Sequence, residues 1–224
     1  MEIYCNKKKI VTSLSIFALL LITIHIVILC IYYYVGDPEK FDFVQMFDLD
    51  MEANIPTVFS SLILALSALC FYLLGLYAEN TNHADKPYWF GLGAIFLFLS
   101  FDEGATIHEA IGDYTEKFVH ASGYLFYPWV ISYGGLVTFL GIMYFRFFWK
   151  MEKKVFWSFM LSAFIYLLGA VVFELFGANE ASAHGTDTVL YSTLYTIEES
   201  LEMFGVIYLI WILLSLLEKK KLHF

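Results

Sequence analysis

Long apolar runs alternate with short polar segments along the whole chain. Six runs are long enough to cross a membrane as helices, because a helix rises 1.5 Å per residue and the hydrocarbon core is about 30 Å thick. They cover about residues 10–35, 54–78, 88–111, 124–148, 155–177 and 189–217. The pattern predicts an all-α fold in which residues 1–224 form a single integral membrane bundle of six transmembrane helices.

The link between the first two runs has a pattern of its own. The stretch GDPEKFDFVQMFDLDME at 36–52 is acidic but carries Phe41, Phe43 and Phe47 at short intervals. This spacing predicts a short segment that lies on the membrane surface. Asn54 and Pro56 follow, and they are residue types favoured at the N-cap and the first turn of a helix.

The composition agrees with a membrane protein. Hydrophobic residues make up 60% of the chain and charged residues only 16%, and these values exclude an ordinary soluble domain of this size. The three cysteines, Cys5, Cys30 and Cys70, form neither a disulfide framework nor a metal-binding knuckle. No basic stripe marks a surface for nucleic acid, so we expect membrane lipid rather than nucleic acid as a partner.

Basic residues gather at 7–9, 146–154 and 219–221. Six spans would place these three groups on one side of the membrane, and the positive-inside rule makes that side cytoplasmic. Both termini are then inside, in a cytoplasmic or inner membrane. The acid-rich segments are predicted to face the extracytoplasmic side.

Acidic and histidine side chains enter the apolar runs at a common depth. Counted at 1.5 Å per residue, they lie roughly 20–30 Å from the cytoplasmic helix ends. They are His25, Asp102, Glu103, His108, Glu109, Glu174, Glu198, Glu199 and Glu202. An ionised side chain facing lipid costs at least about 2.5–3.5 kcal/mol, so these groups should face one another or a wet chamber that opens outward.

Helical spacing refines this arrangement. On one continuous helix, Asp102 and Glu109 would share a face, whereas Glu103 and His108 would point elsewhere. In the last run, Glu198 precedes Glu202 by four residues, so the two carboxylates lie on one face. No Lys or Arg lies at this depth in the sequence, and the compensating positive charge must come from protons, metal ions or histidines.

A metal site is the first hypothesis for this cluster. Carboxylates with histidines suit Zn, Fe or Mn, and an all-oxygen subset suits Ca²⁺, so one or two divalent ions are expected. The candidate ligands are Asp102, His108, Glu109, Glu174, Glu199, Glu202, His25 and His184. Glu103 and Glu198 are the candidate catalytic groups, as outer-shell residues or a general base.

This hypothesis predicts a metal-dependent hydrolase or oxidoreductase that acts on a lipid or another apolar small molecule. The chain lacks both the HExxH motif and the paired Glu-x-x-His motifs of di-iron bundles. Whether Glu52, Glu180 and His120 join the site is left open. In general design the chamber is similar to that of seven-helix zinc hydrolases such as alkaline ceramidases and adiponectin-type receptors, but their histidine-rich order is absent and no residue is carried over.

Two alternatives use the same residues differently. Buried acids without cationic partners are typical of proton or cation pathways, which predicts a transporter or channel. Against a complete pathway, the cytoplasmic halves of the runs are almost wholly apolar, as in YWFGLGAIFLFLS before Asp102. The other alternative is a non-catalytic binding or assembly subunit. The sequence leaves the oligomeric state open.

Overall fold

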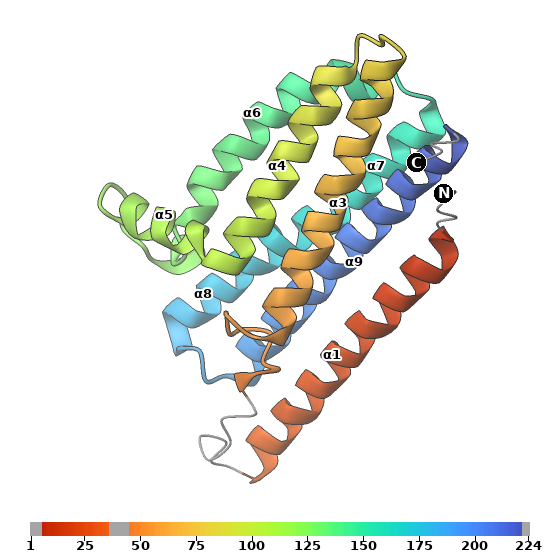
Figure 1. Cartoon of the computed structure of the whole chain (residues 1–224). Coiled ribbons are helices and arrows are strands. Elements are labelled where there is room, and N and C mark those ends of the chain that lie inside the picture. The colour runs from red at the N-terminus through yellow and green to blue at the C-terminus, as the bar shows by residue number, and fades with distance from the viewer. Residues whose placement is uncertain (1–5, 36–44, 221–224) are drawn as a thin grey trace.

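Figure 1 shows a computed structural model in which residues 6–35 and 45–220 are described. Among the described residues, 84% are helical and none lies in a strand. The α-helices are α1 (Lys7–Val35), α3 (Ile55–Asn80), α4 (Lys86–Ala105), α5 (Ile107–Glu116), α6 (Trp129–Trp149), α7 (Lys153–Leu167), α8 (Glu174–His184) and α9 (Val189–Lys219). A 3₁₀ turn at Gly123–Leu125 and a π-helical segment at Leu168–Phe173 complete the order.

Five helical units are long and apolar enough to cross a membrane. They are α1, α3, α6, the continuous unit Lys153–His184 and α9, and the bent pair of α4 and α5 makes a sixth if it counts as one span. The prediction of an all-α membrane protein is confirmed at this level. The predicted surface segment falls largely on residues 36–44, which lie outside the described residues.

The third predicted span differs from the structure because it is two helices. Thr106 lies between α4 and α5 with φ 53° and ψ 38°, a left-handed conformation, and the two helix axes differ by 80°. Asp102 accepts a hydrogen bond from the backbone N–H of His108 (2.7 Å), which holds the chain in this turn instead of a continued helix. The expected common face of Asp102 and Glu109 is therefore lost.

The fifth predicted span is longer than expected and contains an irregular segment. The π-helical residues Leu168–Phe173 join α7 directly to α8, so the helical unit runs to His184 rather than ending near residue 177. Glu180 and His184 consequently lie on a helix and not in a loop. A π segment widens the helix locally, and such segments occur frequently at functional sites.

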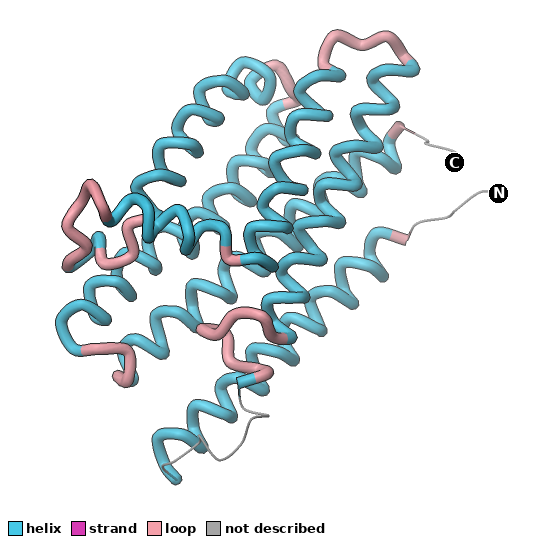
Figure 2. The backbone as a smooth tube through the Cα atoms, turned by 60° about the vertical axis from the view of Figure 1, so that its left-hand side comes forward, coloured by secondary structure: helices cyan, strands magenta, loops and turns pink. Residues whose placement is uncertain are grey.

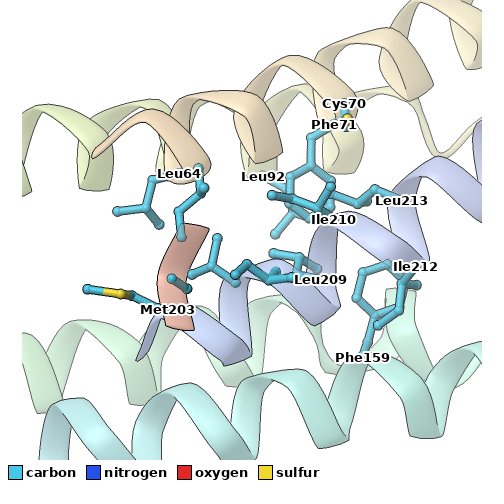
Figure 3. Packing of buried hydrophobic residues seen from close by; sticks show 14 of the residues in the cluster. Leu64, Cys70, Phe71, Leu92, Phe159, Met203, Leu209, Ile210, Ile212 and Leu213 are labelled. Atoms are coloured by element: carbon cyan, nitrogen blue, oxygen red, sulfur yellow. The ribbon is translucent and has the colours of Figure 1, made fainter. Parts of the chain in front are cut away.

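The packing of α9 against α3 and α7 forms the core of the bundle. Figure 3 shows Phe71 and Leu92 facing Ile210 and Leu213, with Phe159 of α7 on the other side. Ile210 and Leu213 have no exposed surface. The part of the bundle around Ile210 and Leu213 is filled by uncharged side chains, as the apolar runs of the sequence predict.

Helix α1 lies along α9 and begins at the end of the bundle where α9 finishes (Figures 1 and 2). The Nζ atom of Lys7 is 2.6 Å from Glu218 Oε2, and it lies 5.1 Å from the centroid of the Trp211 ring. The links between α3 and α4 and between α6 and α7 are at this same end. The beginning of α3, helices α5 and α8 and the start of α9 are at the opposite end.

Candidate functional site

A cavity of about 730 Å³ lies among α3, α4, α5, α6, the π segment, α8 and α9, at the end opposite Lys7. Its described lining has eleven acidic residues, one histidine and no Lys or Arg. The acids are Asp50, Glu52, Asp102, Glu103, Glu109, Asp113, Glu116, Glu174, Glu198, Glu199 and Glu202. We call this space the acidic cavity.

Most of the residues that sequence reasoning singled out line this cavity. They are Asp102, Glu103, His108, Glu109, Glu174, Glu198, Glu199 and Glu202. His25 and His184 do not line it, and neither do Glu180 and His120. The side chains of α4, α5, α8 and α9 thus meet around one space, although they come from distant parts of the chain.

The turn at Thr106 places His108 between two carboxylates. Its ring Nδ1 is 3.5 Å from Asp102 Oδ1, and its Nε2 is 3.4 Å from Glu52 Oε1. Glu52 comes from the segment that leads into α3, so the histidine connects that segment with α4. When His108 is protonated, both contacts are ion pairs, and it is the cavity's one potential cation among the described lining residues.

Trp129, at the start of α6, continues this network across the cavity wall. Its ring packs edge-on against that of His108 with centroids 5.3 Å apart, and its Nε1–H donates to Glu174 Oε1 at 2.8 Å. Glu174 and Glu198 both line the cavity, so α8 and α9 each contribute a carboxylate to this part of the wall. Two ionised carboxylates in one enclosed space repel each other unless a proton or a cation lies between them.

Close approach of the π segment to α9 brings further carboxylates to the wall. A Cβ atom at Gly169 would lie 2.7 Å from the backbone oxygen of Glu198, and one at Gly205 would lie 2.9 Å from the backbone nitrogen of Tyr166. Both glycines therefore permit a contact that a larger residue would prevent. Tyr166 and Glu202 both line the cavity at this contact.

Asp50 lies on the cavity wall before α3 begins. Its Oδ1 accepts a hydrogen bond from Tyr191 Oη at 2.9 Å, and that hydroxyl is 3.1 Å from Tyr127 Oη. Asp50 is exposed, but protein atoms around its side chain remove part of its solvent. This desolvation, together with the negative charges of Asp48 and Glu174, raises the pKa of Asp50 to about 6. Burial also raises the pKa of Tyr127.

The predicted metal ligands do not form a ligand group. Among the described residues, no three or more His, Cys, Asp or Glu side chains are arranged to hold a metal ion. Both ring nitrogens of His108 already face a carboxylate, Asp102 at Nδ1 and Glu52 at Nε2. His184 instead lies 3.1 Å from Glu180 of its own helix, on the exposed side of α8.

His25 has a structural position. It has no exposed surface, its Nδ1 accepts a hydrogen bond from the backbone N–H of Leu49 (3.2 Å), and its Nε2 is 3.1 Å from Thr196 Oγ1. The same Nδ1 also lies 3.4 Å from Asp48 Oδ1. The Thr196 hydroxyl donates a hydrogen bond to Ser192 O. His25 thereby joins α1 to α9.

Sequence reasoning did not include several lining residues. Asp50 lies in the link that was predicted to rest on the membrane surface, Asp113 and Glu116 were not among the candidate residues, and Glu52 was left open. The aromatic members were also not singled out, namely Phe126, Tyr127, Trp129, Tyr133, Tyr166, Tyr191 and Tyr195. Asn54 was the one sequence signal for the position of Asp50 and Glu52. Its side chain caps α3 and also donates a hydrogen bond to Asp48 O (2.6 Å), so it fixes the acidic segment beside the bundle.

The chain belongs to the family described as "Domain of unknown function (DUF8692)", whose model matches residues 13–217. The match begins within α1 and extends nearly to the end of α9, so it includes all or most of every α-helix. No curated protein and no solved structure matches the chain.

Proposed function

We propose that this family member is a membrane protein that binds cations in the acidic cavity. The observation that carries the proposal is the lining, where eleven acidic side chains meet no Lys or Arg among the described residues. Carboxylates in a partly enclosed space repel one another unless protons or cations occupy the space between them. A cavity of one sign of charge also concentrates oppositely charged ligands.

The spread of the acids favours loosely held, hydrated cations. The carboxylates extend from Asp50 through Asp102 to Glu202 around about 730 Å³, and they do not converge on one point. A cavity of this size has room for a cation together with its water. Attraction by many separate carboxylates binds a cation more weakly than direct coordination by a fixed set of ligands. Protons compete with the cation for the same carboxylates.

The lysine-rich end gives the proposed orientation. Lys7, Lys8 and Lys9 begin α1, Lys219 ends α9 and Lys220 follows it, at the end of the bundle away from the acidic cavity. The positive-inside rule then makes the cavity extracytoplasmic. Cations enter it from that side in this proposal.

Interrupted helices favour transport as the second candidate function. Helix α4 ends at the cavity, where Thr106 turns the chain, and the π segment Leu168–Phe173 reaches the same wall through Ala170 and Val171. Transporters coordinate ions at such discontinuous helices. The apolar packing around Ile210 closes the other half of the bundle, so a transport cycle requires a second conformation.

A metal-dependent enzyme acting on a lipid or another apolar molecule stays a prediction of the sequence. It needs several of the predicted ligands at one point, and the described side chains do not provide that group. The cavity lining supplies charge and aromatic surface, which support cation binding more directly. Metal titration in the experiment below also tests this prediction.

The test measures thermal unfolding of the detergent-purified protein with Na⁺, K⁺, Ca²⁺ or Mn²⁺ added separately, at pH 7.5 and at pH 5. We expect at least one cation to raise the melting temperature, and less so at pH 5 because protons compete. The combined change Glu198→Gln, Glu199→Gln and Glu202→Gln should abolish the shift. Glu79→Gln, at the exposed far end of α3, is the matched control.

The proposal is overturned if none of the four cations stabilises the wild-type protein. It is also overturned if the shift persists in the triple variant. Cation flux into liposomes that contain the protein distinguishes the two candidates, because binding without flux leaves only the first. A tight stoichiometric site for Mn²⁺ would favour the enzyme instead.

A further inference from the structure

A second cavity of about 330 Å³ lies at the lysine-rich end of the bundle. Its wall comes from the ends of α3, α6 and α9, the starts of α4 and α7, and the links between them. Its described charged or ionisable residues are His83, Asp85, Lys150, Glu152, Lys219 and Lys220. We call it the basic cavity.

One carboxylate of the basic cavity pairs with a lysine, because Glu152 Oε2 is 3.6 Å from Lys219 Nζ. Asp85 Oδ2 is 3.3 Å from His83 Nδ1, a nitrogen that also accepts a hydrogen bond from the Asp85 backbone N–H. Three lysines face two carboxylates, so the charge of the lining is about +1 with His83 neutral and about +2 with it protonated. The cavity therefore has positive charge that its own acids do not neutralise.

Lys150 and Lys220 supply this positive charge. Neither forms an ion pair with a carboxylate among the described residues within 4.0 Å. The Lys220 ammonium lies 4.3 Å from the centroid of the Tyr77 ring, a cation–π contact at a partly buried position. Burial lowers the pKa of Lys220, and the nearby Asp85 only partly offsets this effect.

The remaining wall is apolar. Trp89, Phe147, Val155 and Leu216 line the space beside the lysines. Trp89 and Phe147 pack edge to face with centroids 4.9 Å apart, and both are largely buried. A ligand that fits this wall has an anionic group for the lysines and an apolar part beside it.

We propose that the basic cavity binds the phosphate group of an anionic phospholipid. Basic pockets between transmembrane helices on the cytoplasmic side are suited to such headgroups, because the leaflet there is rich in anionic lipid. The phosphate lies between Lys150 and Lys220, and the glycerol and first acyl carbons lie against Trp89 and Leu216. The lipid then connects the ends of α3, α6 and α9. This site is independent of the cation bound at the other end of the bundle.

The test uses the full chain in detergent, titrated with short-chain phosphatidylglycerol, short-chain phosphatidylcholine or inorganic phosphate while thermal unfolding is recorded. Phosphatidylglycerol should raise the melting temperature at lower concentrations than phosphatidylcholine, and inorganic phosphate should have little effect. The double variant Lys150→Gln, Lys220→Gln should weaken the apparent affinity for phosphatidylglycerol about tenfold or more. Lys8→Gln, Lys9→Gln removes two exposed charges from the same end and should change it less than about twofold.

Equal stabilisation by the two lipids overturns the proposal, and so does an unchanged affinity in the Lys150 and Lys220 double variant. Stabilisation by inorganic phosphate as strong as that by phosphatidylglycerol also overturns it, because the site then binds free phosphate. If the double variant does not fold, Lys150→Gln alone serves, since this side chain is exposed and its loss leaves the packing intact.

Discussion

Asp102 holds His108 in two ways, because its Oδ1 accepts the histidine backbone N–H at 2.7 Å and lies 3.5 Å from the ring Nδ1. The first contact stabilises the 80° turn between α4 and α5, and the second orients the imidazole toward Glu52. One buried carboxylate thus shapes both the backbone and the electrostatics of the acidic cavity. The same residue was predicted as a metal ligand from its depth alone.

Asp102→Ala should destabilise the start of α5. The change leaves the His108 N–H without its acceptor, and loss of a hydrogen bond to a charged group costs about 1.5–3 kcal/mol. Hydrogen exchange of the peptide covering 104–112 should become faster, whereas α9 should be unaffected. Asp113→Ala removes an exposed acid of the same cavity and should leave this exchange unchanged. Equal exchange in both variants would show that Asp102 does not hold the turn.

Thr106→Gly should stabilise the protein. Thr106 has φ 53°, and a β-branched residue in the left-handed region costs about 1 kcal/mol or more relative to glycine. The melting temperature should rise by a few degrees. Ala105→Gly, one residue earlier at the end of α4, should lower it, since glycine in a helix is unfavourable. A lower melting temperature for Thr106→Gly would mean that the threonine side chain stabilises the turn.

The helices and the meeting of their acids follow from properties that the sequence carries directly. Run length and hydropathy identify the spans, and the fixed rise of a helix places Asp102, Glu174 and Glu202 at one height. When the helices pack together, these side chains surround a common space, and they form the lining of the acidic cavity.

Irregular backbone could not be predicted in the same way. Thr106 is not a residue type that signals a left-handed turn, and the turn depends on Asp102 reaching six residues along the chain. The π segment at Leu168–Phe173 contains Gly169, whose backbone closely approaches α9. Such features arise from tertiary packing, so the continuous helices expected from apolar runs are interrupted where the acidic cavity forms.

Stability should depend on pH through Asp50. Its pKa is about 6 in the folded protein, against an ordinary value of 3.8, so the folded state holds the proton more tightly. Below about pH 4 the raised pKa of Asp50 therefore costs no folding stability. As the pH rises toward 6, the unfolded state loses this proton more readily than the folded state, and the loss of folding stability grows. Asp50→Asn should be a few degrees more stable than the wild type above pH 6, and this difference should vanish near pH 4.

The control for Asp50 is Asp187→Asn, an exposed acid outside the acidic cavity but at the same end. Melting temperatures of the three proteins between pH 4 and pH 8 in one detergent give the comparison. A constant difference between Asp50→Asn and the wild type across this range would contradict the raised pKa.

Gly205→Ala should destabilise the bundle and widen the contact between α7 and α9. The added Cβ would lie within 2.9–3.0 Å of Tyr166 backbone atoms, so the helices must separate, and overpacking of this kind costs about 1–3 kcal/mol. Gly141→Ala on α6 meets no atom within 4 Å and is the matched control. It should be neutral or slightly stabilising because alanine favours helix. Equal melting temperatures for the two variants would show that the contact at Gly205 is not close.

Removal of the His25 side chain should loosen α1 from the bundle. His25→Leu leaves the backbone N–H of Leu49 without its acceptor, which costs about 1–3 kcal/mol, and also removes the contact of Nε2 with the Thr196 hydroxyl. Thr196→Val should cost less, because the backbone N–H of Leu49 keeps its acceptor. In a double-mutant cycle the two changes should couple by about 1 kcal/mol.

Thr193→Val, whose hydroxyl bonds only within α9 among the described contacts, should show no coupling with His25→Leu. Additive effects of His25→Leu and Thr196→Val would mean that the two side chains do not stabilise each other. A coupled pair would make His25 a structural link between helices, held in place by the same segment that carries Asp50 into the acidic cavity.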